Sequence, residues 1–106
     1  MELKKLFGQN VQKYRKLRKL TQEKLAEIVG IDATSISSIE TGKFFPTADN
    51  LQKIALALDI RPETLFFFEN NNTNEEICEE IFGIINGFKN DNIRLNAVRN
   101  FIRAIV

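Results

Sequence analysis

The stretch TQEKLAEIVGIDATSISSIETG, residues 21–42, decides the fold because it predicts two short helices separated by a tight turn. Thr21 and Asp32 are good N-cap residues, and each precedes about eight residues whose apolar side chains recur at helical spacing. Gly30 suits the turn between the helices, since that turn needs a residue at ease with positive φ. Gly42 ends the second helix for the same reason. Together the two helices have the pattern of a helix-turn-helix unit.

The contacts between two such helices can also be predicted from the sequence. Steeply crossing helices need a small residue where they touch, and Ala26 provides one. Apolar side chains are expected to fill the corner between the helices, namely Ile28, Ile36 and Ile39. The same spacing also fits two ordinary helices of a small all-α bundle, so spacing alone leaves both interpretations open.

Helical periodicity extends over most of the chain, since apolar residues recur every three or four positions and strict alternation never persists. A first helix is expected over residues 2–18, with a lysine-rich face opposite its apolar stripe. Pro46 and Thr47 begin a fourth helix, and Pro62 opens a fifth. The stripe of the first helix consists of Leu3, Leu6, Phe7, Val11, Tyr14 and Leu17. Residues 1–68 are therefore predicted to form a five-helix, all-α domain.

A polar segment, residues 69–74, is predicted to be a linker. Two amphipathic helices follow it over residues 75–106, and two helices of this length cannot bury both apolar stripes alone. Packing on the N-terminal domain and pairing with another copy of the chain both remain open, and we favour a homodimer. The residues expected in the dimer interface are Ile81, Ile85, Phe88, Val98, Phe101, Ile102 and Ile105.

Composition excludes several classes of protein. The 106 residues are enough for one compact domain with a small appendage. The longest apolar run, LFFF at residues 65–68, is too short to span a bilayer, and the N-terminus lacks the pattern of a secretory signal. A single cysteine, Cys78, and the lack of histidine exclude an internal disulfide and a Cys/His zinc site. We expect a cytoplasmic protein without a membrane partner.

An enzymatic role is not expected either. The acidic cluster Glu75, Glu76, Glu79 and Glu80 has the i, i+4 spacing of carboxylates in di-iron bundles. Those sites also use histidine, which this chain lacks, so the cluster is interpreted as a solvated helix face. No glycine-rich phosphate loop is present, and Cys78 has no histidine partner for nucleophilic catalysis. We therefore predict no catalytic residues, no cofactor and no metal.

The net charge of +1 conceals an asymmetry along the chain. Residues 1–48 carry nine Lys and Arg against five Asp and Glu, which gives +4. Residues 49–80 carry two against eight, which gives −6, and residues 81–106 carry four against one, which gives +3. A positive N-terminal half suits an acidic polymer as partner, although a solvated helical surface gives the same count.

A longer pattern carries a resemblance to a known family. The run YRKLRKLTQEKLAEIVGIDATSISSIETGKFFPTADNLQKIALALDIRPETLF contains LTQ, KLA, VGI, SISSIE, the GK pair, the Pro46 turn, LQKIALAL and PETLF in one register. Over roughly residues 4–68 the chain resembles the lambda-repressor-like, or Xre-type, helix-turn-helix transcriptional regulators. The resemblance implies a five-helix lambda-repressor-like DNA-binding domain, to which the C-terminal pair of helices is added.

The resemblance also implies roles for individual residues. The second helix of the unit, residues 33–40, is similar to the recognition helix that enters the major groove. Gln22 and Lys43 match positions that contact phosphates. Arg15 and Glu40 match a charged pair that ties the first helix to the end of the recognition helix, although Arg15 is also compatible with a surface or phosphate contact.

The exposed face of this helix departs from the family pattern. Relatives often place Gln, Asn, Arg or Lys there, whose bidentate bonds to bases are worth about 1–3 kcal/mol each in discrimination. This chain instead has Ala33, Thr34, Ser37 and Ser38 as its expected base contacts. Their single hydrogen bonds and methyl groups predict modest discrimination per residue. A second departure is the Phe44–Phe45 pair, which we expect to pack inward on the fourth helix, with contact between an exposed Phe44 and a deoxyribose as the alternative.

Two functional hypotheses follow. The first is a sequence-specific transcriptional regulator, a repressor that binds an inverted-repeat operator in double-stranded DNA as a homodimer. The second is a protein-interaction module, such as an antitoxin-like partner of another protein, with weak or vestigial DNA binding. The near-neutral charge and the small side chains of residues 33–38 keep the second hypothesis open.

Overall fold

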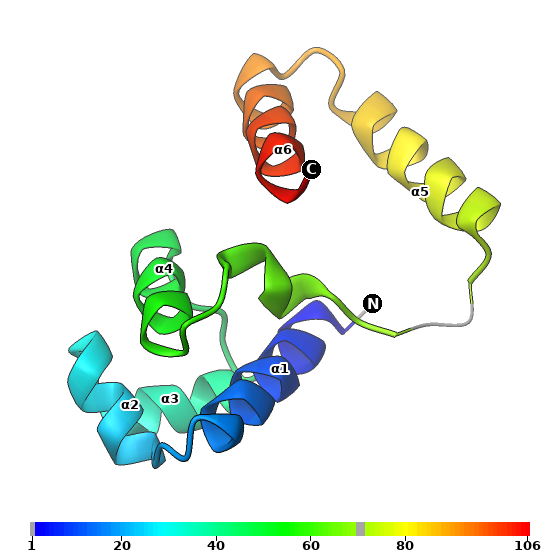
Figure 1. Ribbon diagram of the computed structural model, residues 1–106. Coiled ribbons are helices and arrows are strands. Elements are labelled where there is room, and N and C mark those ends of the chain that lie inside the picture. The colour runs from blue at the N-terminus through cyan, green and yellow to red at the C-terminus, as the bar shows by residue number, and fades with distance from the viewer. Residues whose placement is uncertain (1, 70–71) are drawn as a thin grey trace. The chain divides into compact units, whose positions relative to one another are not determined.

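The computed structural model describes residues 2–69 and 72–106, and every regular element within those ranges is helical. The chain divides into two compact units, one ending at Phe68 and one beginning at Glu69 (Figure 1). The elements are α1 (Leu3–Leu17), α2 (Gln22–Val29), α3 (Ala33–Glu40), α4 (Ala48–Ala57), the 3-10 helix η1 (Pro62–Phe66), α5 (Asn74–Gly87) and α6 (Asn92–Ile105). None of the helices described is long and apolar enough to cross a membrane.

The first unit encloses one apolar core. α1 packs on α3 and η1, α2 packs on α3 and α4, and α4 also contacts η1. Burial of these side chains is the main favourable term in the stability of such a domain. The buried apolar residues are Phe7, Val11, Leu25, Ala26, Val29, Ile36, Ile39, Ile54, Ala55, Leu58 and Leu65.

The predicted fifth helix is a single 3-10 turn rather than an α-helix. Pro62 opens it as expected, but the backbone becomes extended again at Phe67. Its Phe66 ring packs beside Phe7, with ring centroids 5.2 Å apart. A five-residue segment that supplies side chains to a core has no need of full α-helical turns.

The Phe44–Phe45 pair does not pack inward as a unit. Phe45 lies 4.6 Å from Phe7 between ring centroids and is also near Phe66, so it packs on α1 and η1. Phe44 is 40% exposed. Because the loop between α3 and α4 passes the end of α1, only one of two successive side chains can face the core.

The apolar faces of α1 and α2 are narrower than expected. Ile28, predicted to lie in the corner between α2 and α3, is 51% exposed, whereas Val29 is buried. Val29 follows Leu25 by four residues and Ala26 by three, so it shares a helix face with both. Leu3 and Leu17, at the two ends of α1, are 37% and 63% exposed.

Two N-cap side chains of the first unit form hydrogen bonds, those of the predicted Thr21 and of Thr47, whereas the predicted N-cap Asp32 does not. The Thr21 hydroxyl accepts from the Lys24 amide at 3.0 Å, and the Thr47 hydroxyl accepts from the Asn50 amide at 3.2 Å. Asp32 has the extended backbone of an N-cap, but its side chain makes no capping bond. The start of α3 is therefore set by backbone geometry and packing, and not by a hydrogen bond from a capping side chain.

The close packing of α1 against the C-terminal end of α3 depends on two glycines. A methyl group at Gly8 would lie 2.2 Å from the Ile39 carbonyl oxygen, much closer than atoms can approach. Gly42 has a φ of +80° and lies against the Lys5 backbone, where a methyl group would be 2.8 Å from the Lys5 Cα. The sequence pattern of α1 did not predict the role of Gly8, because the residue that Gly8 contacts, Ile39, lies 31 positions further along the chain.

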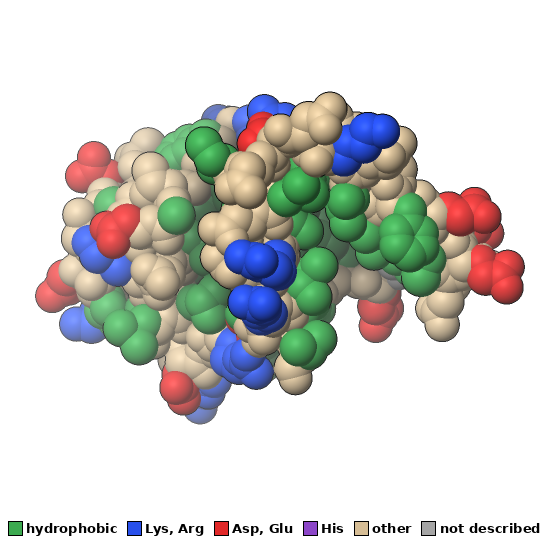
Figure 2. All heavy atoms as spheres, turned by 90° about the horizontal axis from the view of Figure 1, so that it is seen from above, with side chains coloured by type: hydrophobic (Ala, Val, Ile, Leu, Met, Phe, Trp, Pro, Cys, Tyr) green, Lys and Arg blue, Asp and Glu red, His purple; other side chains and the backbone are tan. Residues whose placement is uncertain are grey.

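The second unit consists of α5, a tight turn and α6. The N-cap of α5 is Thr73, so the helix begins inside the predicted linker 69–74, of which residues 70 and 71 lie outside the described part. Asp91 caps α6 by accepting from the Arg94 amide at 3.1 Å. Neither helix contains a buried residue. Apolar side chains are visible at the surface beside basic and acidic ones (Figure 2).

Candidate nucleic-acid interface

The turn between α2 and α3 is closed by backbone hydrogen bonds. Gly30 has a left-handed φ of 87°, and its amide donates to the Ala26 carbonyl at 2.8 Å. The Ile31 amide donates to the same carbonyl at 3.0 Å. Gly30 therefore takes the position at which a side chain would be strained, as the sequence predicted.

α3 has one buried face and one open face. Ile36 and Ile39 are buried in the core, as the helical spacing predicted. On the opposite side Thr34 is exposed, and Ala33, Ser37 and Ser38 are half-buried. The four small side chains therefore share a face that the first unit leaves accessible to a ligand.

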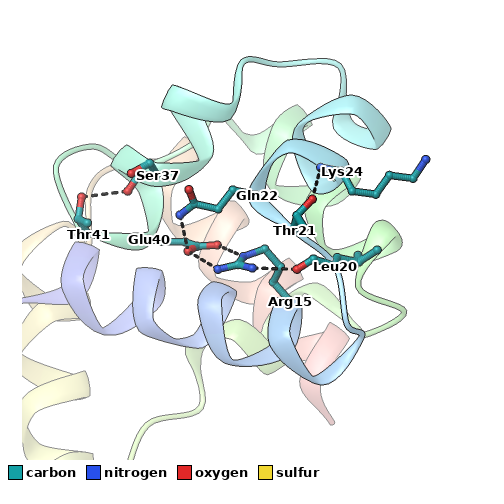
Figure 3. A network of polar contacts seen from close by, with 8 residues as sticks. All are labelled: Arg15, Leu20, Thr21, Gln22, Lys24, Ser37, Glu40 and Thr41. Atoms are coloured by element: carbon teal, nitrogen blue, oxygen red, sulfur yellow. Dashed lines mark hydrogen bonds and ion pairs between the residues drawn. The ribbon is translucent and has the colours of Figure 1, made fainter.

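A buried ion pair joins α1 to the end of α3 (Figure 3). The Arg15 Nε donates to Glu40 Oε2 at 2.6 Å, and Arg15 Nη2 donates to Glu40 Oε1 at 3.1 Å. A third donor of the guanidinium, Nη1, reaches the Leu20 carbonyl oxygen at 2.8 Å. This bidentate contact is the geometry in which an arginine fixes both the position and the orientation of a carboxylate.

The environment of the pair keeps Arg15 charged. Its hydrogen bond to Glu40 raises the pKa of the Arg15 guanidinium above its ordinary value, although burial acts in the opposite direction. Because a raised folded-state pKa stabilises the fold below the unfolded value, this contribution persists throughout the working range of pH. The Glu40 and Arg15 side chains are 1% and 10% exposed, so solvent and salt screen the pair little.

Gln22 is joined to the same network (Figure 3). Its Nε2 donates to Glu40 Oε1 at 3.0 Å, a contact that the predicted phosphate role did not include. An amide group has two N–H donors, so one hydrogen remains for a phosphate after the other has bound Glu40. The first residue of α2 is therefore positioned by the last residue of α3.

The C-terminal end of α3 presents Lys43 to solvent. The Thr41 hydroxyl donates to the Ser37 carbonyl at 3.0 Å, and the Lys43 amide donates to the Ser38 carbonyl at 2.9 Å. These bonds satisfy carbonyls that the helix end would otherwise leave open. Lys43 itself is exposed and lies directly after Gly42. Thr41 was not among the predicted site residues, and helical periodicity alone gives no signal for such a terminal bond.

The arrangement places the predicted structural residues together. Ala26 is buried, Gly30 forms the turn, Ile36 and Ile39 anchor α3, and the Arg15–Glu40 pair fixes the end of that helix. A short helix held on one face and open on the other, after a three-residue turn, is a helix-turn-helix DNA-binding unit.

Comparison with known proteins agrees with this geometry. A family model described as "Helix-turn-helix domain" matches residues 8–67. Control protein C.SmaI of Serratia marcescens is 39% identical over 59 residues, which are 56% of this chain and 70% of that protein. The chain belongs to the helix-turn-helix family of transcriptional regulators.

Solved structures resemble the same part of the chain. The restriction-modification controller protein C.AhdI from Aeromonas hydrophila is 37% identical with a TM-score of 0.57, over 58% of this chain and 94% of that one. The biofilm master regulator SinR, solved in complex with DNA, is 32% identical with a TM-score of 0.55, over 57% of this chain and 98% of that one.

Proposed function

We propose that the chain is a cytoplasmic repressor that binds an inverted-repeat operator as a homodimer and acts by occupancy rather than by catalysis. The observation that carries the proposal is α3 itself, whose buried face and Arg15–Glu40 pair fix it rigidly while its small side chains stay accessible. The similarity to SinR, which was solved with DNA, supports this use of the helix. Repression is favoured because it requires only that a bound dimer exclude polymerase.

In this proposal α3 enters the major groove. Thr34, Ser37 and Ser38 each offer a hydroxyl that can donate to or accept from a base edge, and the methyl groups of Ala33 and Thr34 can pack on a thymine methyl. The absence of long polar side chains on this face lets the helix backbone approach the groove closely. Selectivity then comes from a few single hydrogen bonds together with DNA shape.

The contacts with the DNA phosphate backbone are assigned to Gln22 and Lys43. They lie at the start of α2 and just beyond α3, so they bracket the helix on two sides. Gln22 is held by Glu40 and can donate its second amide hydrogen to a phosphate oxygen. Lys43 supplies a positive charge, which makes its contact dependent on salt.

The salt dependence of operator binding tests this assignment. Operators are first selected from random duplex DNA, and we expect inverted repeats with half-sites about 10–10.5 base pairs apart. Replacing Lys43 by alanine is then expected to reduce the log–log salt slope by about 2, because each of two phosphate contacts contributes roughly 0.9. Binding constants measured by fluorescence anisotropy over a range of salt give both slopes.

Lys53→Ala is the matched control, since Lys53 is exposed on α4, a helix that packs on α2 and η1. Its slope should equal that of the unaltered chain. An unchanged slope in the Lys43 variant would remove Lys43 from the interface. If no duplex is preferred even at low salt, the repressor proposal fails and the protein-interaction hypothesis takes its place.

Replacing both Thr34 and Ser37 by alanine tests the base contacts. Each lost hydrogen bond is worth about 1 kcal/mol, so preference for the operator over unrelated DNA should fall by about tenfold or more. Binding to unrelated DNA should stay the same, because alanine supports the helix at least as well. Ser35→Ala, at the α3 serine outside the proposed base contacts, should alter neither value. If operator preference survives the double change, selectivity lies in DNA deformability instead.

Dimerisation is assigned to the second unit. A single recognition helix reads only a few base pairs, so two copies are needed for tight and specific binding. The apolar stripes of α5 and α6 supply surface for this contact, since Ile81, Phe101, Ile102 and Ile105 are at least 40% exposed. The remaining residues of the proposed interface are half-buried, namely Ile85, Phe88 and Val98.

A further inference from the structure

The two helices of the second unit carry opposite charges. α5 contains four glutamates and no basic residue, whereas α6 contains three arginines and no acidic residue. All seven of these residues are exposed. Such a separation of charge between two amphipathic helices of equal length is a means of specifying which helix faces which.

The charges lie along the borders of the apolar stripes. Glu80 borders the stripe of α5 that contains Ile81, and Glu76 lies one helical turn before it. Arg99 borders the stripe of α6 that contains Ile102, and Arg103 lies one helical turn after it. These are the positions at which paired helices place the charges that choose partner and orientation.

Within one chain the two stripes do not cover each other. The helices diverge from the turn that joins them (Figure 1), and no extended contact forms between α5 and α6. Ile81 on α5 and Ile102 on α6 remain 44% and 42% exposed. Complementary apolar and charged surfaces are therefore both present in the second unit, and among its described residues they form no extended contact with each other.

We propose that α5 of one copy packs against α6 of a second copy, and α6 against α5, so that two crossed pairs form the dimer. This inference rests on the proposed homodimer and specifies its pairing. A two-fold axis generates the α5–α6 contact twice, and in each the glutamate border of one copy faces the arginine border of the other. The apolar stripes supply the affinity, and the charges select crossed pairing over α5 with α5 or α6 with α6.

Charge reversal in two different chains tests the pairing. The first full-length variant carries Arg99→Glu and Arg103→Glu, which makes both of its helices acidic. The second carries Glu76→Lys and Glu80→Lys, which leaves its α5 without net charge but places two lysines where the glutamate border was, beside a basic α6. Each variant alone should dimerise at least about tenfold more weakly than the unaltered chain, because its crossed pairs now join like charges in both copies.

An equimolar mixture of the two variants should instead form a heterodimer, since in every crossed pair the acidic border of one helix then faces the basic border of the other. Native mass spectrometry distinguishes it from either homodimer by mass. The defects of the single variants should shrink in about 1 M salt, where the Debye length is only about 3 Å. Asn86→Lys and Asn100→Glu place the same charges on the opposite faces of α5 and α6 and should leave dimerisation unchanged.

Two outcomes would overturn the crossed pairing. If each variant dimerises like the unaltered chain, the charges do not meet. If both variants are weakened and the mixture does not recover, the charges meet within one chain. The proposed dimer is tested separately by Ile102→Asp against the control Ile93→Asp, which lies on the outer face of α6. An unchanged dimer in the Ile102 variant would place the homodimer contact elsewhere.

Discussion

Replacing Gly8 by alanine is expected to lower the free energy of unfolding by about 3 kcal/mol, at the upper end of the usual range for overpacking. The added methyl group would lie 2.2 Å from the Ile39 carbonyl oxygen and 2.7 Å from that of Glu40. Both obstructing atoms belong to the backbone, so no side chain can rotate away. α1 must therefore move away from α3, which opens the core around Phe7 and Val11. Chemical denaturation measures the loss directly.

Gly83→Ala is the control for this change. Gly83 is also inside a helix, but a methyl group there meets nothing within 4 Å. Alanine is favoured over glycine in a helix by about 1 kcal/mol, so this variant should be as stable as the unaltered chain or more stable. Equal stability of the Gly8 and Gly83 variants would show that α1 and α3 are not in close contact at Gly8.

Most of the first unit could be predicted from local pattern. The N-cap Thr21, the turn at Gly30 and the spacing of Ile36 and Ile39 each depend on residues within a few positions of one another. Local chemistry of this kind fixes where helices begin, end and face. The all-α assignment followed from it, the helix-turn-helix assignment required the family resemblance as well, and both are confirmed by the fold and by the family match.

The features that the sequence pattern did not predict depend on contacts between segments that are far apart along the chain. Gly8 is constrained by a carbonyl 31 positions away, and Phe45 is buried because the loop after α3 passes α1 and η1. Ile28 and Val29 are adjacent apolar residues, and only the position of α3 decides which of them is covered. The contact between Gln22 and Glu40 is likewise set by the crossing of α2 and α3. A pattern with a period of 3.6 residues shows which side of one helix is apolar, but not which residue of another segment will contact it.

Replacing Glu40 by alanine is expected to lower the free energy of unfolding by about 3–5 kcal/mol, the range observed when one partner of a buried ion pair is removed. Arg15 would keep its charge in a site that is almost closed to water, where its hydrogen bond to the Leu20 carbonyl would remain but its buried carboxylate partner would be lost. Gln22 would also lose the acceptor that holds its side chain. Thermal or chemical unfolding gives the change in stability, and operator binding gives the change in function.

A second variant separates stability from positioning. Arg15→Met combined with Glu40→Leu replaces both charges by apolar groups, and such replacements of buried pairs are often neutral or stabilising by about 1–4 kcal/mol. We expect this variant to recover stability but to bind the operator more weakly than the unaltered chain. The reason is that the end of α3 and the amide of Gln22 would no longer be oriented by bonds of 2.6–3.1 Å. Full operator affinity in the doubly substituted chain would show that packing of Ile36 and Ile39 alone orients the recognition helix.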